Sequence, residues 1–190
     1  MRIFSILITI VYLVICATAS AQNNLPKGFK KAAITLLNGS TQTVFIKDNI
    51  RSNASLTAIN TATGKRENYD GNNLISVEID NEKLLCIQGD FFKVITEGNL
   101  YFLQKYSDAS GKISYNGAVA VSSNGTEGKI GDYFFYIAAS KDLKQISAKN
   151  FDLIIDETLS GCASAQVKAK FCKSNIAELK VAIELFNNCK

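Results

Sequence analysis

Paired carboxylates are the residues of this chain whose types and spacing come nearest to a catalytic site. Two acidic side chains that flank a groove can hydrolyse a glycosidic bond without histidine. The candidate pairs are Glu78 with Asp80 and Asp156 with Glu157. Alternation places Glu78 and Asp80 on one face of a strand, as on any solvent-facing strand, and Asp156 and Glu157 lie on the polar side of an expected helix. We therefore predict no catalytic residue and keep a histidine-free glycan hydrolase as the alternative function.

The 190-residue chain contains no histidine and five cysteines. The lack of histidine excludes a serine or cysteine nucleophile that depends on an imidazole base, a histidine-ligated zinc site and a histidine pH switch. No C-x-x-C pair is present either. We therefore expect neither a metal site nor a cofactor.

A glycine-rich segment, residues 124–131, is the nearest approach to a phosphate-binding loop. Closely spaced glycines can expose backbone N–H groups to an anion. A P-loop, however, needs Ser or Thr where this segment has Ile130, and a glycine where the chain has Ser123. We interpret the segment as a turn.

Aromatic residues form three short runs, Phe91-Phe92, Tyr101-Phe102 and Tyr133-Phe134-Phe135-Tyr136. Alternation along a strand is expected to send at least one ring of each run to the core and another outward. Core packing is the expectation for Phe92, Phe102, Phe134 and Phe135. Tyr101, Tyr133 and Tyr136 remain as candidates for binding a sugar or a peptide, because rings offer large contact areas.

The first 21 residues have the pattern of an export signal. Arg2 precedes an apolar run from Ile3 to Ile15, and Ala19-Ser20-Ala21 has the A-x-A form of a signal-peptidase site. This run is shorter than the roughly 20 residues that span a bilayer. We predict cleavage before Gln22, a secreted or periplasmic protein, and no transmembrane segment in the mature chain. An uncleaved membrane anchor is the alternative.

Removal of residues 1–21 leaves 20 basic and 17 acidic side chains. This small excess, without a basic cluster, gives no reason to expect nucleic acid or an anionic membrane as a partner. Four cysteines remain, namely Cys86, Cys162, Cys172 and Cys189. An even number of cysteines in an exported chain favours disulfides over free thiols.

The elements that must position these residues divide the mature chain into a β-rich domain, 22–145, and a helical tail, 146–190. Asn38-Gly39 between two β-prone runs predicts a hairpin. Further runs at 56–62, 74–80, 83–88, 92–96 and 100–104 leave no room for helices between them. They predict an antiparallel meander that can curl toward a barrel. We expect a weak hairpin around 113–121 and the last strand of the sheet at 132–137.

From Ser147 the apolar period changes from 2 to 3.6 residues, which predicts three helices packed on the sheet. The second is expected from Ala163 to about Lys170, where it presents Val167 and Phe171, and the third from Asn175 to about Asn188. If these two helices fold back on each other, Cys162 and Cys189 meet at the open end of the hairpin. We therefore expect a Cys162–Cys189 disulfide first. Cys172 then either reaches Cys86 on the sheet or stays free.

The end of the chain, in which a cysteine opens a short helix and a later helix ends in residues 185–190 (LFNNCK), resembles the C-terminal part of uncharacterised exported proteins of Bacteroidota-type bacteria. The strand–glycine–strand stretch 92–102 is similar to their β part. Cys172 and the lack of a proline after Cys162 depart from that pattern. The resemblance implies the compartment and the architecture, and no activity.

These patterns together predict an exported α+β protein in which an antiparallel sheet precedes a small helical tail. They favour a non-enzymatic binding or structural protein of the cell envelope. The expected partner is an envelope protein or a glycan.

Overall fold

The structure, a computed structural model, describes residues 26–116, 119–122 and 125–189, with the side chains of 113–122 left aside. The predicted export signal and its cleavage site lie outside these residues. The β-rich part comprises β1 (Lys30–Leu36), β2 (Thr41–Asn49), α2 (Ile50–Asn53), β3 (Ser55–Asn60), β4 (Arg66–Asp70), β5 (Leu74–Ile79), β6 (Glu82–Ile87), β7 (Asp90–Thr96), β8 (Leu100–Lys105), β9 (Ile113–Asn116), β10 (Val119–Ser122), β11 (Tyr133–Ile137) and β12 (Asp142–Ile146). The helical tail comprises α3 (Phe151–Thr158), α4 (Ala163–Lys170), the 3-10 helix η1 (Ile176–Leu179) and α5 (Lys180–Asn188).

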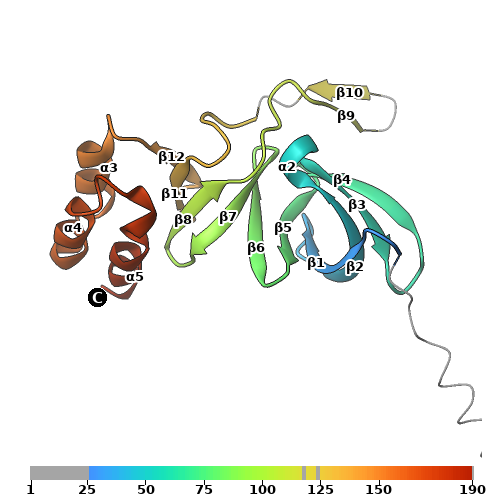
Figure 1. The fold of residues 1–190 in the computed structure, drawn as a ribbon, viewed down its shortest axis with the longest axis horizontal. Helices are drawn as coiled ribbons and strands as arrows, with labels where there is room; N and C mark the ends of the chain where they lie inside the picture. Colours follow the sequence, from blue (N-terminus) through green and yellow to red (C-terminus); the bar gives the residue numbers. More distant parts are fainter. Residues whose placement is uncertain (1–25, 117–118, 123–124, 190) are drawn as a thin grey trace, which may run out of the picture.

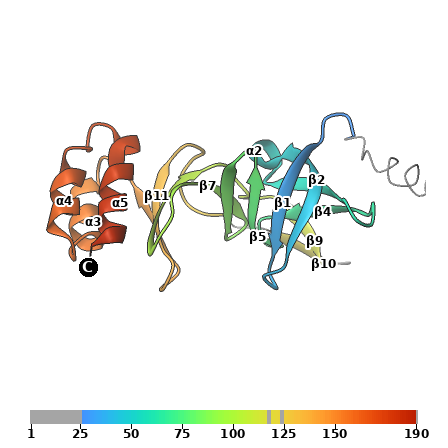
Figure 2. The same cartoon turned by 90° about the horizontal axis from the view of Figure 1, so that it is seen from below.

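One antiparallel sheet of ten strands organises the molecule. The strand order is β12-β11-β8-β7-β6-β5-β1-β2-β3-β4, and β9 and β10 pair separately. Helices α3–α5 lie at one end of an elongated molecule and β1–β4 at the other (Figure 1). The sheet curls at the β1–β4 end but does not close (Figure 2), since β4 and β12 remain its edges. The predicted α+β class, an antiparallel sheet followed by a small helical tail, is confirmed.

The predicted hairpins recur along the sheet, and two strands, β4 and β12, were not predicted. The Asn38-Gly39 turn joins β1 to β2, and the Asn38 side-chain oxygen accepts a hydrogen bond from the backbone N–H of Ser40 at 2.9 Å. The expectation that residues 132–137 form the last strand is wrong, because β12 pairs with β11 at the sheet edge. This short strand, of sequence DLKQI, contains only two apolar residues and therefore shows too little alternation to be recognised.

One face of the sheet carries two separate cores. The curled core lies between β1, β2, β3, β5, β6 and β7, and includes Ile34, Ile46, Leu56, Val77 and Phe91. The helix-covered core joins β8, β11 and β12 to the three helices, and includes Phe102, Phe135, Phe151, Ile155 and Ile183. Along β7, Phe91 packs in the curled core, whereas Ile95 packs against the helix-covered core. Phe92 and Val94 of β7 pair with Lys105 and Leu103 of β8. Phe91 and Phe102 alternate with these residues and therefore share the other face, so both cores lie on the same face.

The opposite face of β6, β7, β8, β11 and β12 carries a third apolar cluster, which corrects one expectation. Phe91 and Phe92 are both fully buried, and so are Phe134 and Phe135. The prediction that alternation sends one ring of each run outward is therefore wrong for Phe91-Phe92, whereas the expected core packing of Phe92, Phe102, Phe134 and Phe135 is confirmed. Both faces of β7 and β11 are covered at these positions, so both phenylalanines of each pair are buried.

The helices of the tail lie at the predicted positions, but α4 buries a different face from the one predicted. Helix α4 packs through Ala165 and Ala169, whereas Val167 is 60% exposed and Phe171 is 79% exposed. Small residues on the inner side allow α4 to lie close to α5, since the two helices share the most extensive contact within the tail. Among the described residues, no helix is both long and apolar enough to cross a membrane.

Two of the four cysteines lie at disulfide distance. The Cα atoms of Cys162 and Cys189 are 6.1 Å apart, and the structure joins their sulfur atoms. Cys86 and Cys172 are free thiols. Of the two outcomes expected for Cys172, the bridge to Cys86 is therefore wrong and the free thiol is the one found, because Cys172 is buried among the helices whereas Cys86 packs against the curled core.

A side chain on α5 fastens the tail to the sheet. The Asn187 amide oxygen accepts a hydrogen bond from the backbone N–H of Leu100 at 3.0 Å, and its amide nitrogen donates to the Leu100 carbonyl at 2.9 Å. Asn187 thus pairs with β8 as a neighbouring strand would. A Cβ at Gly98 would lie 2.3 Å from the Asn187 amide nitrogen, so this contact requires glycine in the β7–β8 turn.

Candidate functional site

The most deeply buried polar group of the described residues is an ion pair at the centre of the sheet. Asp90 begins β7 and Lys105 ends the neighbouring strand β8, and both side chains are fully buried. The Lys105 ammonium nitrogen lies 3.2 Å from one Asp90 carboxylate oxygen. Such a pair is stable in the interior only when hydrogen bonds satisfy its remaining donors and acceptors.

The segment between β8 and β11 supplies those hydrogen bonds. The Lys105 ammonium donates to the carbonyls of Thr126 at 2.7 Å, Gly128 at 3.1 Å and Glu127 at 3.3 Å. The Asp90 carboxylate accepts from the backbone N–H of Ala109 at 2.6 Å, and from the N–H and hydroxyl of Thr126 at 2.7 and 2.6 Å. The pair is fully engaged and fastens the segment to the sheet, so it has no group to offer to a substrate.

The glycine-rich segment binds a cation, the Lys105 ammonium, rather than a phosphate. Three consecutive carbonyls, those of Thr126, Glu127 and Gly128, converge on a cation. An anion site needs converging N–H groups instead. The described residues 125–131 therefore form a loop that binds a lysine of the same chain, in agreement with the interpretation of a turn.

The structure separates the three tyrosines that sequence patterns singled out. Tyr101 on β8 and Tyr136 on β11 are cross-strand neighbours with ring centroids 6.0 Å apart. Tyr133 points to the other face, where its ring stacks on Phe102 at 5.3 Å against the helix-covered core. Tyr101 and Tyr136 thus share one surface, and Tyr133 contributes to packing under the helices.

Tyr101 and Tyr136 belong to the third apolar cluster, which we call the tyrosine face. Its members are Leu85, Ile87, Phe92, Val94, Tyr101, Leu103, Phe134, Tyr136 and Leu143. Phe92, Leu103 and Phe134 are buried, and the other six are only partly buried. The described helices contribute no residue to this cluster and pack on the opposite face. The tyrosine face is therefore an apolar sheet surface that the chain covers only in part.

A charged pair borders the tyrosine face beside Tyr101. Glu97 accepts hydrogen bonds from the Lys83 ammonium at 2.6 Å and from the Tyr101 hydroxyl at 3.2 Å. The hydrogen bond from Lys83 is the main cause that lowers the pKa of Glu97 below its ordinary value. Burial and the Glu97 charge raise the pKa of Tyr101, so its hydroxyl stays protonated at neutral pH and donates to the carboxylate.

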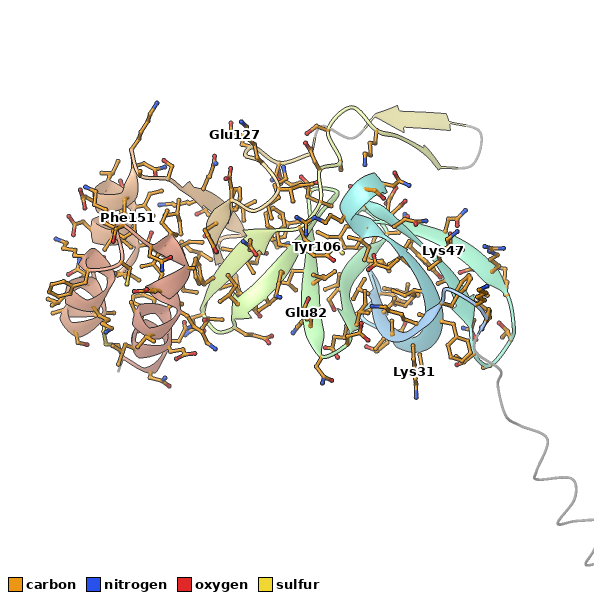
Figure 3. The ribbon with its side chains drawn as sticks, viewed as in Figure 1. Lys31, Lys47, Glu82, Tyr106, Glu127 and Phe151 are labelled. Atoms are coloured by element: carbon orange, nitrogen blue, oxygen red, sulfur yellow. A yellow bond between two sulfur atoms is a disulfide. The ribbon has the colours of Figure 1, made fainter. Side chains whose placement is uncertain are left out.

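A cleft of about 450 Å³ adjoins the tyrosine face, and we call it the amide cleft. Its lining residues are Gln88, Thr126, Glu127, Phe134, Lys141, Asp142, Leu143 and Gln145. Phe134 and Leu143 also belong to the tyrosine face, so the two surfaces are continuous. Glu127 stands on the loop beside β11 and β12 (Figure 3).

A second cleft, of about 280 Å³, contains carboxylates and lies against the curled core. Lys30, Asp48, Asp80, Glu82 and Tyr106 line it over a floor of Ile79 and Leu84. Tyr106 and Glu82 lie near the middle of the molecule (Figure 3). Each acid accepts a hydrogen bond: Asp80 from Lys30 at 2.6 Å, Glu82 from Lys93, and Asp48 from the N–H of Ile50 at 3.0 Å. We call this the acidic cleft.

The carboxylate pairs suggested by the sequence are not brought together in a cleft. Asp80 lines the acidic cleft, but Glu78 is not among its lining residues. On α3, Asp156 pairs with Lys170 at 2.9 Å and Glu157 pairs with Lys144 at 3.2 Å, all at the surface. Pattern reasoning missed Asp48 and Glu82, because these acids come from different strands and no spacing along the chain connects them.

Comparison with known proteins adds no family to this description. No family model matches the chain, and no curated protein or solved structure matches it. In the part of the chain that the structure describes, no three Cys, Asp or Glu side chains gather as metal ligands would. The resemblance to exported Bacteroidota-type proteins stays a prediction, and the two clefts and the tyrosine face are the surfaces from which a function can be inferred.

Proposed function

We propose that this chain is an exported, non-enzymatic binding protein of the cell envelope that holds a glycan or an envelope protein on its tyrosine face. The export signal pattern in residues 1–21 supports the compartment. The Cys162–Cys189 pair at disulfide distance is compatible with an oxidising environment. The observation that carries the binding role is the partly covered tyrosine face.

Six side chains of the tyrosine face stay partly in contact with water. Leaving Tyr101, Tyr136 and four aliphatic side chains half in water has an unfavourable free energy of hydration, because each apolar Å² contributes roughly 25 cal/mol when buried. A contiguous apolar surface that stays partly in water is typical of a site where another molecule binds. A ligand with an apolar surface would bury the same area and use the tyrosine hydroxyls as polar contacts.

A sedimentation experiment with isolated cell envelopes tests this role. We expect the mature protein to co-sediment with envelopes, and the double variant Tyr101→Ala/Tyr136→Ala to remain in solution. Phe171→Ala is the matched control, because it removes an exposed ring at the far end of the helical tail. Envelopes treated with protease distinguish a glycan ligand from a protein ligand. Equal sedimentation of the double variant and the wild type would contradict the proposal.

The alternative, a histidine-free glycan hydrolase, is favoured by one observation. The acidic cleft brings Asp48, Asp80 and Glu82 together beside Tyr106. A hydrolase needs one carboxyl group that donates a proton to the leaving oxygen, whereas these three side chains accept hydrogen bonds from lysines or a backbone N–H. Release of reducing sugar from envelope glycan by the wild type, abolished by Asp80→Asn or Glu82→Gln, would establish the hydrolase instead.

A further inference from the structure

Two long polar residues at the amide cleft hold a backbone conformation that their side chains disfavour. Gln88, in the β6–β7 turn, has φ of 51°, and Lys141, in the β11–β12 turn, has φ of 60°. Left-handed backbone is common for glycine and tolerated by Asn and Asp, but it is unfavourable for residues with longer side chains. Both residues line the same cleft although they come from turns far apart in the sequence.

The neighbouring hairpin shows which residues such a turn ordinarily uses. Between β5 and β6 the two-residue turn is Asp80-Asn81, with φ of 51° and 66°. Between β6 and β7 the turn is Gln88-Gly89, with φ of 51° and 89°. The two turns have equivalent backbones, and only the second has a residue outside the Asn, Asp and Gly preference at its first position. Local folding therefore does not account for Gln88, and a role for its side chain in the cleft does.

The lining of the amide cleft indicates the chemistry of its ligand. Gln88, Gln145 and Lys141 supply hydrogen-bond donors, while Glu127 and Asp142 supply acceptors. Gln145 donates to Asp132 at 2.7 Å, which holds one amide in place. Charges of both signs around an apolar floor of Phe134 and Leu143 do not suit a simple anion or cation. They suit a ligand whose hydroxyl groups donate and accept, and whose C–H surface packs on the floor.

We propose that the amide cleft binds a short saccharide, and that Gln88 and Lys141 determine its specificity. The proposal rests on the proposed envelope-binding function and names the ligand class for the surface next to the tyrosine face. The cleft volume of about 450 Å³ falls within the roughly 300–1,000 Å³ of small-molecule sites. A longer glycan that leaves the cleft over Leu143 passes onto the tyrosine face, because Leu143 belongs to both surfaces.

The test measures stability and binding in the same variants. Gln88→Asn and Lys141→Gly place residues that tolerate left-handed backbone in the two turns and withdraw the side-chain contacts. We expect both variants to unfold at the same or a higher denaturant concentration than the wild type, while the Kd for the saccharide rises about tenfold for each lost polar contact. Asn81→Gly, which relaxes the neighbouring turn, is the matched control and should leave the Kd unchanged.

Binding is followed through the backbone amide NMR signals of Gln88, Lys141 and Asp142 in titrations of the mature protein. The probes are soluble N-acetylglucosamine oligosaccharides and neutral gluco-oligosaccharides, with short uncharged peptides for comparison. Absence of shifts with every saccharide, shifts with peptides only, or an unchanged Kd in Gln88→Asn would each overturn the saccharide site. If the site fails while envelope sedimentation still depends on Tyr101 and Tyr136, only this inference fails. If sedimentation does not depend on those tyrosines, the proposed function fails as well.

Discussion

The two halves of the ten-stranded sheet bury the same face in different ways. The β1–β6 half curls around Ile34, Ile46 and Val77 and needs no layer of helices over its core. The half formed by β7, β8, β11 and β12 is covered by α3–α5 instead. A sheet that covers itself leaves its other face to water, whereas a sheet covered by helices can present a second apolar face. Such a face is present on the second half and extends onto the first only at the bordering strand β6, through Leu85 and Ile87.

The burial patterns of single strands express this difference. In β2, the buried residues Val44 and Ile46 alternate with exposed or half-buried ones, as expected for a strand with one wet face. In β7, Asp90, Phe91 and Phe92 are buried in succession. Strands with two apolar faces require two covering layers. The helices provide one layer, the loop held by Lys105 provides part of the other, and the tyrosine face is the part that remains for a ligand.

Breaking the buried ion pair has the largest expected effect on this comparison. Lys105→Met leaves the Asp90 carboxylate buried without its cation, which typically costs about 3–5 kcal/mol of unfolding free energy. Lys30→Met is the matched control in the other half, because the Lys30–Asp80 pair is more than half exposed and solvent screens it, so its loss should change the stability little. Urea unfolding of both variants measures the difference, and similar losses would contradict the assigned role of Lys105.

A double variant distinguishes the effect of the two charges on stability from the effect of the hydrogen bonds that hold the loop. Asp90→Leu/Lys105→Met removes both charges but leaves the N–H groups of Ala109 and Thr126 without their acceptor. We therefore expect the double variant to stay destabilised, whereas a pair that acted only through its charges would be replaced at little cost.

The disulfide is expected to have the next largest effect, and to act in the helix-covered half. It closes a separation of 27 residues, for which the loop-entropy model gives about 3.5 kcal/mol. Cys162→Ala/Cys189→Ala should increase hydrogen exchange in α4 and α5 and leave β1–β3 protected, since the described residues of the tail contribute no side chain to the curled core. Cys86→Ala, a free thiol beside the curled core, is the control. Equal loosening of both halves would show that they unfold as one unit.

Sequence patterns predicted the elements more reliably than their partners in space. Turn residues such as Asn38-Gly39 and the change of apolar period at Ser147 identify hairpins and helices, because both signals act over a few residues. Alternation also predicts that Tyr133 and Tyr136 point to opposite faces of the sheet. It does not predict which of the two faces the helices cover. That choice depends on the packing of Phe102 and Phe135 against α3–α5, which involves residues far apart in the sequence.

The candidate site was predicted least well, for the same reason. Asp90 and Lys105 occupy ordinary strand positions, and only the pairing of Phe92 with Lys105 across β7 and β8 brings the two charges together. The lining of the amide cleft comes from three separate turns and loops and from strands β11 and β12. The sequence contains one weak indication of the buried ion pair. Lys105 follows Tyr101 and Leu103 on the same side of β8, so a charged residue stands where the alternation predicts an apolar one.

The smallest expected effect concerns two Lys–Glu–Tyr groups, one in each half. In β4, Glu67 bonds to Lys65 and Tyr69; at the rim of the tyrosine face, Glu97 bonds to Lys83 and Tyr101. Hydrogen bonds from the lysines lower the pKa of both glutamates below 4.5. A lowered pKa contributes stability above pH 4.5 that is lost as the pH falls through the folded-state value.

Because both glutamates are partly exposed and solvent screens their ion pairs, we expect each group to contribute little to the stability. Glu67→Gln and Glu97→Gln should therefore both flatten the fall of the urea midpoint between pH 5 and pH 3 by a similar small amount. Envelope sedimentation should weaken in Glu97→Gln alone, because only Glu97 orients a ring of the tyrosine face. If Glu67→Gln weakened sedimentation equally, the binding surface would have to extend over the curled half, and the contrast between the two halves would no longer explain function.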